Sequence, residues 1–90
     1  MAKKLVNQGT AGFEEKLDVL VIAEPIATGI EVVLTSSVKR QYGEHIIALI
    51  KTVVQEAGYD NVKITAVDGG AWDYTIKARV LGALQRRMNA

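Results

Sequence analysis

Few side chains in this ninety-residue sequence could carry out acid–base or nucleophilic chemistry. Its one histidine is His45, and its only serines are Ser36 and Ser37. His45 lies beside an apolar helical pattern, which favours a place at the margin of the core over a role as general base. A serine nucleophile needs a positioned base, and both serines stand where a helix is expected to begin. The sequence therefore predicts no self-sufficient active site.

Metal and phosphate sites have little support either. The chain has no cysteine, which excludes disulfides, thiolate metal sites and cysteine nucleophiles. A single histidine cannot build a histidine metal site, and carboxylates alone give only a weak indication of a hard cation. The spacing of the glycines matches neither a phosphate-binding loop nor the dinucleotide fingerprint.

One pair of cations could bind an anion. Residues 73–80 alternate between polar and apolar types directly after the turn signal Asp68-Gly69-Gly70, which predicts a strand. On that strand Lys77 and Arg79 would project from one face and could receive a phosphate or a carboxylate. A solvated strand face would show the same pattern. The alternative for this segment is a helix, with four apolar residues on one side: Trp72, Ile76, Val80 and Leu84.

Three further segments read as strands. The β-branched runs at residues 17–24 and 30–35 predict two strands that run antiparallel and are joined by a hairpin loop at Pro25–Gly29. Residues 62–67 alternate cleanly and predict another strand.

The clearest pattern is a helix from Val38 to Ala57, where apolar residues recur at spacings of three and four. Ser36 or Ser37 could cap its first turn, and Gly58 stands where helices end in a left-handed residue. A short final helix is expected at residues 81–88, with Arg86 and Arg87 near its end.

These elements predict an α+β fold with the order ββαββα. Its four-stranded, mainly antiparallel sheet would carry both helices on one face, as a two-layer sandwich. Residues 1–17, which include the aperiodic segment Asn7–Gly12, are expected to form a flexible N-terminal segment. Residues 18–90 are expected to form a single domain.

Composition limits the classes of partner. Ninety residues with 49% hydrophobic character suffice for one core. Eleven Lys and Arg against ten Asp and Glu give a net charge of +1, which argues against nucleic-acid binding. No apolar run approaches the ~18 residues that a membrane span needs, and no secretory signal is evident. The sequence predicts a cytoplasmic domain that binds neither nucleic acid nor membrane.

Two separated motifs carry a resemblance to a known family. Thr35–Gly43 matches the pattern SSVxxQ[FY]G, and Asp68–Arg79 matches DxGAxDxx[IL][KR]AR, while Asp18–Val21 and Pro25 stay in register. From Asp18 onward the chain resembles the acyl carrier protein (gamma) subunit of citrate lyase. The carrier subunit of malonate decarboxylase is a more distant resemblance. The resemblance implies a non-catalytic carrier subunit of a citrate-lyase-like complex.

The resemblance also implies a cofactor and partners. In the family, a serine just before the first strand bears a phosphoribosyl-dephospho-coenzyme A arm through a phosphodiester. The arm presents a thioester to larger transferase and lyase subunits. Lys77 and Arg79 match the family's [KR]AR motif, so their face is expected to hold the anionic arm or an acidic partner surface. Asp73 belongs to the same motif and is expected to pair with one of these cations.

The serine of this motif is missing. Aligned to Asp18 without a gap, the family's Ala-Gly-x-x-x-Ser falls on Ala11–Lys16, and the serine position is Lys16. A lysine cannot form the phosphodiester, and the nearest hydroxyl belongs to Thr10.

Several explanations of Lys16 remain open. The chain is an arm-free paralogue that scaffolds or regulates such a complex, or its arm sits on Thr10 or on Lys16. A biotin- or lipoyl-type arm would suit Lys16, although its flanks lack the usual context of those domains. A slipped alignment is disfavoured by the register of Asp18 and Pro25, and an introduced substitution is a further alternative. A third class of function is a stand-alone ligand-binding domain that uses Lys77 and Arg79.

Overall fold

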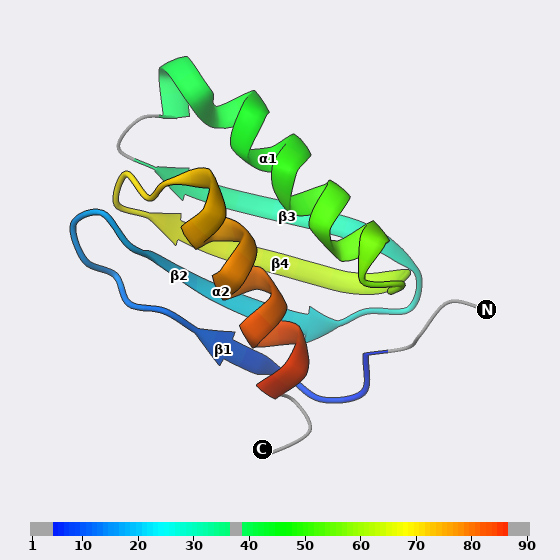
Figure 1. Ribbon diagram of the computed structural model, residues 1–90. Helices are drawn as coiled ribbons and strands as arrows, with labels where there is room; N and C mark the ends of the chain where they lie inside the picture. The colour runs from blue at the N-terminus through cyan, green and yellow to red at the C-terminus, as the bar shows by residue number, and fades with distance from the viewer. Residues whose placement is uncertain (1–4, 37–38, 87–90) are drawn as a thin grey trace.

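The computed structural model describes residues 5–36 and 39–86. Two helices pack on one face of a four-stranded sheet (Figure 1), so the predicted two-layer α+β class is confirmed. The elements in chain order are β1 (Gly9–Ala11), β2 (Val19–Pro25), β3 (Gly29–Ser36), α1 (Lys39–Glu56), β4 (Asn61–Asp68) and α2 (Asp73–Arg86).

The sheet is mixed, with the strand order β1-β2-β4-β3. β2 pairs antiparallel with β1 and β4, whereas β3 pairs parallel with β4. The predicted hairpin between β2 and β3 is wrong, because β4 lies between these two strands, although they do run in opposite directions. The long helix α1 is the crossover that returns the chain parallel to β3. Where the β2–β3 connection passes the start of β4, Ile26 donates its backbone N–H to the carbonyl of Asn61 at 3.0 Å.

The strand predicted at residues 73–80 is wrong, and so is the separate helix at 81–88. Within the described residues, α2 runs without a break from Asp73 to Arg86. Ile76 and Val80 are fully buried, whereas Tyr74 and Ala78 are exposed, although a strand would place all four on one face. The buried residues therefore follow the helical spacing that was the alternative for this segment, while residues 87 and 88 lie outside the described residues.

The fourth strand comes from the N-terminal segment instead. Gly9–Ala11, expected to be loop-like, forms the edge strand β1 against β2. Upstream of β1, Leu5 is buried, and its backbone N–H and carbonyl both bond the side chain of buried Asn61, at 2.7 and 2.9 Å. The Asn61 side chain thus ties Leu5 to the start of β4, in addition to the pairing of β1 with β2.

The core lies between the sheet and the helices. Buried residues from every strand and both helices form one cluster, whose largest fully buried members are Ile50, Ile64, Ile76, Leu84, Val19, Val21, Val54, Val62 and Val80. The opposite face of the sheet carries Ile22, Val33 and Val67, and no described helix packs on it. The described residues thus form one core on one side of one sheet.

The helix α1 ends as predicted. Gly58 has a φ of 91°, and Tyr59 donates its N–H to the carbonyl of Val54 at 3.3 Å, which is a common way to close a helix. At the other end, Ser36 is the last residue of β3, and its hydroxyl donates to a carboxylate oxygen of Asp68 at 2.8 Å. Ser37, the other predicted cap, lies outside the described residues.

Candidate functional site

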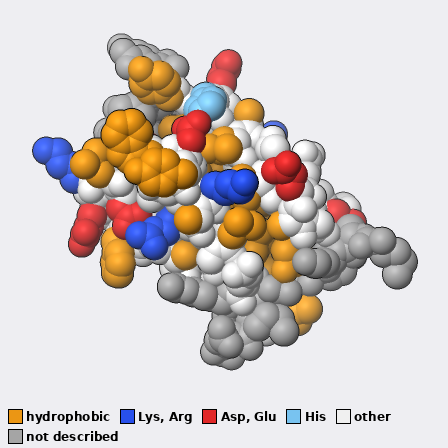
Figure 2. Space-filling model, in the orientation of Figure 1, with side chains coloured by type: hydrophobic (Ala, Val, Ile, Leu, Met, Phe, Trp, Pro, Cys, Tyr) orange, Lys and Arg blue, Asp and Glu red, His pale blue; other side chains and the backbone are white. Residues whose placement is uncertain are grey.

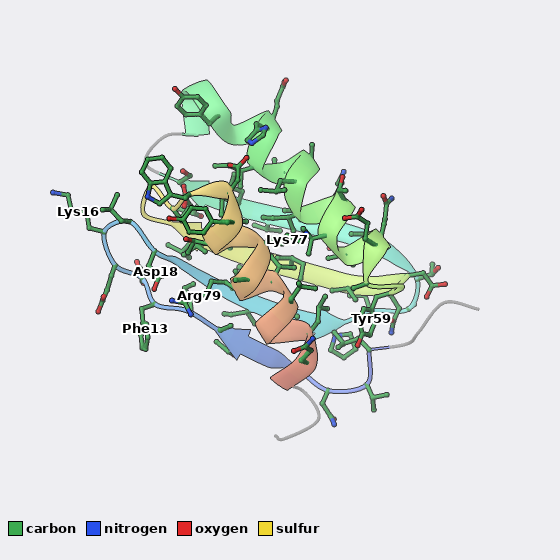
Figure 3. The ribbon with its side chains drawn as sticks, in the orientation of Figure 1. Phe13, Lys16, Asp18, Tyr59, Lys77 and Arg79 are labelled. Carbon is green, nitrogen blue, oxygen red and sulfur yellow. The ribbon has the colours of Figure 1, made fainter. Side chains whose placement is uncertain are left out.

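The predicted attachment position lies on a short loop between β1 and β2. This segment, residues 12–18 (the 12–18 loop), docks against the turn that follows β4. Leu17 donates its N–H to the carbonyl of Gly69, and Gly69 donates its N–H to the carbonyl of Asp18, both at 2.9 Å. Within the loop, Asp18 donates its N–H to the carbonyl of Glu15 at 3.1 Å. Lys16 is exposed and points away from the sheet at the outer end of the loop (Figure 3).

Two glycines allow this close docking. A Cβ atom at Gly69 would overlap the carbonyl oxygen of Glu15, so the loop backbone lies directly on that residue. A Cβ atom at Gly12 would overlap the carbonyl oxygen of Val19, and the φ of Gly12, +82°, is one that other residues rarely adopt. The loop is therefore held by backbone contacts at both of its ends.

A bidentate ion pair fixes the end of the loop to α2. The carboxylate of Asp18 accepts from Nε and Nη2 of Arg79 at 3.0 and 3.1 Å, and also from the N–H of Val19 at 2.7 Å. These hydrogen bonds, that from Arg79 above all, hold the pKa of Asp18 below its ordinary value of 3.8. Parallel donation from a guanidinium to a carboxylate is among the stronger polar contacts in proteins.

The other cation of the predicted pair points elsewhere. Residues two apart on a helix are rotated by about 200°, so Lys77 and Arg79 do not share a face of α2. Lys77 instead lines a shallow groove between the helices, together with Val53, Glu56, Ala57 and Leu81. Because the shared cationic face does not exist, the case for a stand-alone anion-binding domain loses its basis.

Asp73 pairs with a residue that the sequence did not suggest. Its Oδ2 lies 2.7 Å from Nε2 of His45, and both side chains are more than half exposed. The pair links the start of α2 to the second turn of α1. His45 was expected at the margin of the core and is instead at the surface, and the described residues contain no group of three or more potential metal ligands.

An open cleft of about 550 Å³ lies between these two helix starts. Its lining includes three exposed aromatic side chains: Tyr42, Trp72 and Tyr74 are 55%, 62% and 72% exposed. Tyr42 belongs to the apolar pattern that predicted the helix from Val38 to Ala57, yet it is exposed and does not join the core. The cleft adjoins the 12–18 loop, because Gly70 and Ala71 of its lining directly follow Gly69. Sequence reasoning missed this cleft, since its two sides are about thirty residues apart and only the helical form of residues 73–86 brings them together.

Buried Asp68 organises the turn between the loop and the cleft. One carboxylate oxygen accepts from the N–H of Ala71 at 2.9 Å, and the other accepts from the hydroxyl of Ser36 at 2.8 Å. The ends of β3 and β4 and the Gly69-Gly70 turn are thereby tied together. We call this end of the molecule the platform: it consists of the ends of β3 and β4 and the Gly69-Gly70 turn, and the 12–18 loop docks on it.

Comparison with known proteins identifies the family. The family model described as malonate decarboxylase delta subunit (MdcD) matches residues 6–87. The chain belongs to this family. Its relatives include the citrate lyase acyl carrier protein of Latilactobacillus sakei subsp. sakei (strain 23K), which is 42% identical over 83 residues that cover 92% of this chain and 82% of the relative. The citrate lyase acyl carrier protein of Halothermothrix orenii is 40% identical, with 92% and 88% covered, and that of Streptococcus equi subsp. equi is 44% identical, with 84% and 76% covered.

The match to this carrier-protein family includes the whole 12–18 loop. The same match includes both sequence motifs, at residues 35–43 and 68–79, and agrees with the resemblance drawn from them. In the described part of the chain, no helix is long and apolar enough to cross a membrane. Thr10, the fallback acceptor, lies in β1 opposite Ile22 and is exposed on the side of the sheet that the helices leave open.

Proposed function

We propose that this chain is an acyl-carrier-type subunit of a citrate-lyase-like complex. The observation that carries the proposal is the match to the carrier family and to citrate lyase acyl carrier proteins over nearly the whole chain. The chain itself is non-catalytic, and catalysis belongs to larger transferase and lyase subunits. A cytoplasmic location is part of the proposal.

The platform suits a carrier. A carrier must present one position to several partner sites, and tethering replaces diffusion of a free thioester by a high effective concentration. Position 16 is exposed on a loop whose ends lie in β1 and β2, and the loop is held by Gly69 and by the Asp18–Arg79 ion pair. Arg79, predicted to bind an arm or a partner, acts here by positioning the loop.

The 12–18 loop does not fit a phosphodiester-linked arm. None of its seven residues has a hydroxyl group, and the amine of Lys16 stands at the serine position of the family. If the chain bears a phosphoribosyl-dephospho-coenzyme A arm, Thr10 is the nearest hydroxyl, but it lies within a strand. An amine at position 16 would instead suit an arm that ends in a carboxylic acid, because the two can form an amide.

Lys16 is also the observation that favours a second candidate. In this alternative the chain is an arm-free paralogue that acts as a scaffold or regulatory interaction module of the same kind of complex. The platform and the surfaces around the loop would persist, since none of the contacts that hold the loop involves the side chain at position 16.

The deciding experiment is the intact mass of the protein isolated from its native host, with peptide mapping of residues 1–24. An added mass that matches a coenzyme A-derived arm supports the carrier, and the modified peptide identifies Thr10 or Lys16 as the acceptor. A biotin- or lipoyl-sized addition on Lys16 makes this a different swinging-arm domain. The bare mass in the presence of the partner subunits rejects the carrier and leaves the scaffold.

A further inference from the structure

Exposed apolar side chains are concentrated at one end of the molecule. Of seven large hydrophobic residues exposed among those described, five lie on the 12–18 loop or around the aromatic cleft: Phe13, Leu17, Tyr42, Trp72 and Tyr74. We call these five residues the end patch. In Figure 2 orange side chains gather over this end of the molecule.

The end patch is assembled from three separate segments. Phe13 and Leu17 belong to the 12–18 loop, which docks on Gly69, and Trp72 and Tyr74 follow that turn within five residues. Tyr42 comes from α1 and forms the other wall of the cleft. Exposed apolar side chains that gather in one region mark interaction sites, and Trp and Tyr are among the residues most enriched as interface anchors.

We propose that the end patch is the docking surface for a catalytic subunit of the complex, and this inference rests on the proposed function. A subunit that acts at or near position 16 must approach the loop. The patch includes two residues of that loop and the aromatic residues of the adjoining cleft. The cleft would receive an apolar projection of the partner between Trp72 and Tyr42.

Charge defines the partner further. On the loop, exposed Glu14 and Glu15 outnumber the exposed cation Lys16, while Asp73 on the cleft wall is paired with His45. The partner surface should therefore combine its apolar projection with lysine or arginine residues. The same charges argue against a second copy of this chain as occupant, because a symmetric contact through the patch would bring like carboxylates together.

The experiment measures the affinity of this chain for the purified transferase and lyase subunits of its native complex by isothermal titration calorimetry. Trp72→Ala and Tyr74→Ala are each expected to weaken binding of one subunit by about tenfold or more. Both side chains are mostly exposed, so the fold should persist, and circular dichroism melting checks this. Val33→Ala, at an exposed apolar position on the open sheet face, is the matched control and should bind like the wild type.

The charge argument has its own variant. Glu14→Gln combined with Glu15→Gln should weaken binding and reduce its dependence on salt concentration, since interface charges act through screened attraction. An unchanged salt dependence would contradict a basic partner surface.

Three results would overturn the inference. The first is wild-type affinity in the Trp72→Ala and Tyr74→Ala variants. The second is equal weakening by Val33→Ala, which would move the interface to the open sheet face. The third is a tryptophan fluorescence difference between arm-bearing and bare chains without any loss of affinity in Trp72→Ala, which would make the chain's own arm the occupant. Failure of the carrier function is a separate result, because it is read from the intact mass, and a bare chain that binds through the patch still supports the interface.

Discussion

Leu17 holds a backbone conformation that favours glycine. Its φ of 64° is the only positive value at a non-glycine residue in the described part of the chain. Left-handed backbone costs an ordinary residue roughly 1–2 kcal/mol, and the Leu17 side chain is 60% exposed, so it recovers little by burial. The strain lies directly after position 16, where the loop must turn back toward β2.

The strain predicts opposite effects for two substitutions. Leu17→Gly should stabilise the fold by about 0.5–1 kcal/mol. This value is the backbone strain relieved, less the cost of the greater conformational entropy that glycine gives to the unfolded state. Leu17→Val should destabilise it, because a β-branched residue adopts this conformation least readily. Urea unfolding of the three proteins measures the differences. A less stable glycine variant would show that the leucine side chain makes a contact that outweighs the backbone strain.

The Asp18–Arg79 ion pair predicts acid sensitivity. Because the pKa of Asp18 is lower in the folded state than its ordinary value of 3.8, the carboxylate adds stability above that value. This stability is lost as pH falls below 3.8 through the lower folded-state pKa. Asp18→Asn should destabilise the protein at pH 7 by about 1.5–3 kcal/mol, the usual range for hydrogen bonds to charged groups. Thermal melts from pH 7 to pH 2 of both proteins test this, and parallel curves would contradict it.

At the scale of elements, the contact between the 12–18 loop and the Gly69-Gly70 turn is steric as well as polar. A methyl group at position 69 would overlap the carbonyl oxygen of Glu15, so Gly69→Ala should displace the loop. We expect trypsin to cleave the native protein faster after Lys16 in this variant, and stability to fall by about 1–3 kcal/mol.

Gly29→Ala is the control for this prediction. Gly29 also has a positive φ, +89°, but open space surrounds its Cβ direction, and it starts β3 far along the sheet from the loop. Its substitution should lower stability through backbone strain alone and leave cleavage after Lys16 unchanged. Equal acceleration in both variants would mean that global unfolding, and not loop release, exposes the site.

The helix α2 shows where sequence reasoning failed. Residues 73–80 alternate like a strand, yet Ile76 and Val80 lie four apart and serve a helix equally well. What decides is burial against the sheet: these two residues pack in the core with Ala83 and Leu84, whereas Tyr74 and Ala78 have no core to face. Periodicity over eight residues cannot distinguish the two cases. The hydrogen bonds between the Asn61 side chain and the Leu5 backbone could not be predicted either, because no sequence pattern links two residues so far apart.

The candidate site was predictable in part. The motif around Ala11–Lys16 predicts position 16 as the attachment position from sequence alone, and this stays a prediction, while the structure places position 16 on the exposed 12–18 loop. The residues that contact this loop were not predicted. Arg79, which pairs with Asp18, was assigned to a strand face shared with Lys77. The aromatic cleft depends on the packing of α1 beside α2, which joins residues distant in sequence.

At the scale of the whole molecule, one end holds the loop, the cleft and the Asp68 network, while the helices and the sheet hold that end in place. None of the polar contacts that fix the 12–18 loop uses the side chain at position 16. The platform is therefore built independently of the residue that it presents. We therefore expect a scaffold of this kind to accept an arm when a serine stands at position 16.

Lys16→Ser tests this independence. Expressed in a host that loads the arm on its own citrate lyase acyl carrier protein, the serine variant should gain the arm's mass on the peptide that contains position 16. The control Glu15→Ser places the hydroxyl one residue away, where the backbone carbonyl lies against Gly69, and should stay unmodified. A loaded Glu15→Ser would show that the loop does not select the position. A bare Lys16→Ser variant with a normal melting temperature would show that the loading enzyme needs more of its natural carrier than this loop supplies. Parts of the chain other than position 16 would then prevent loading, which favours the scaffold.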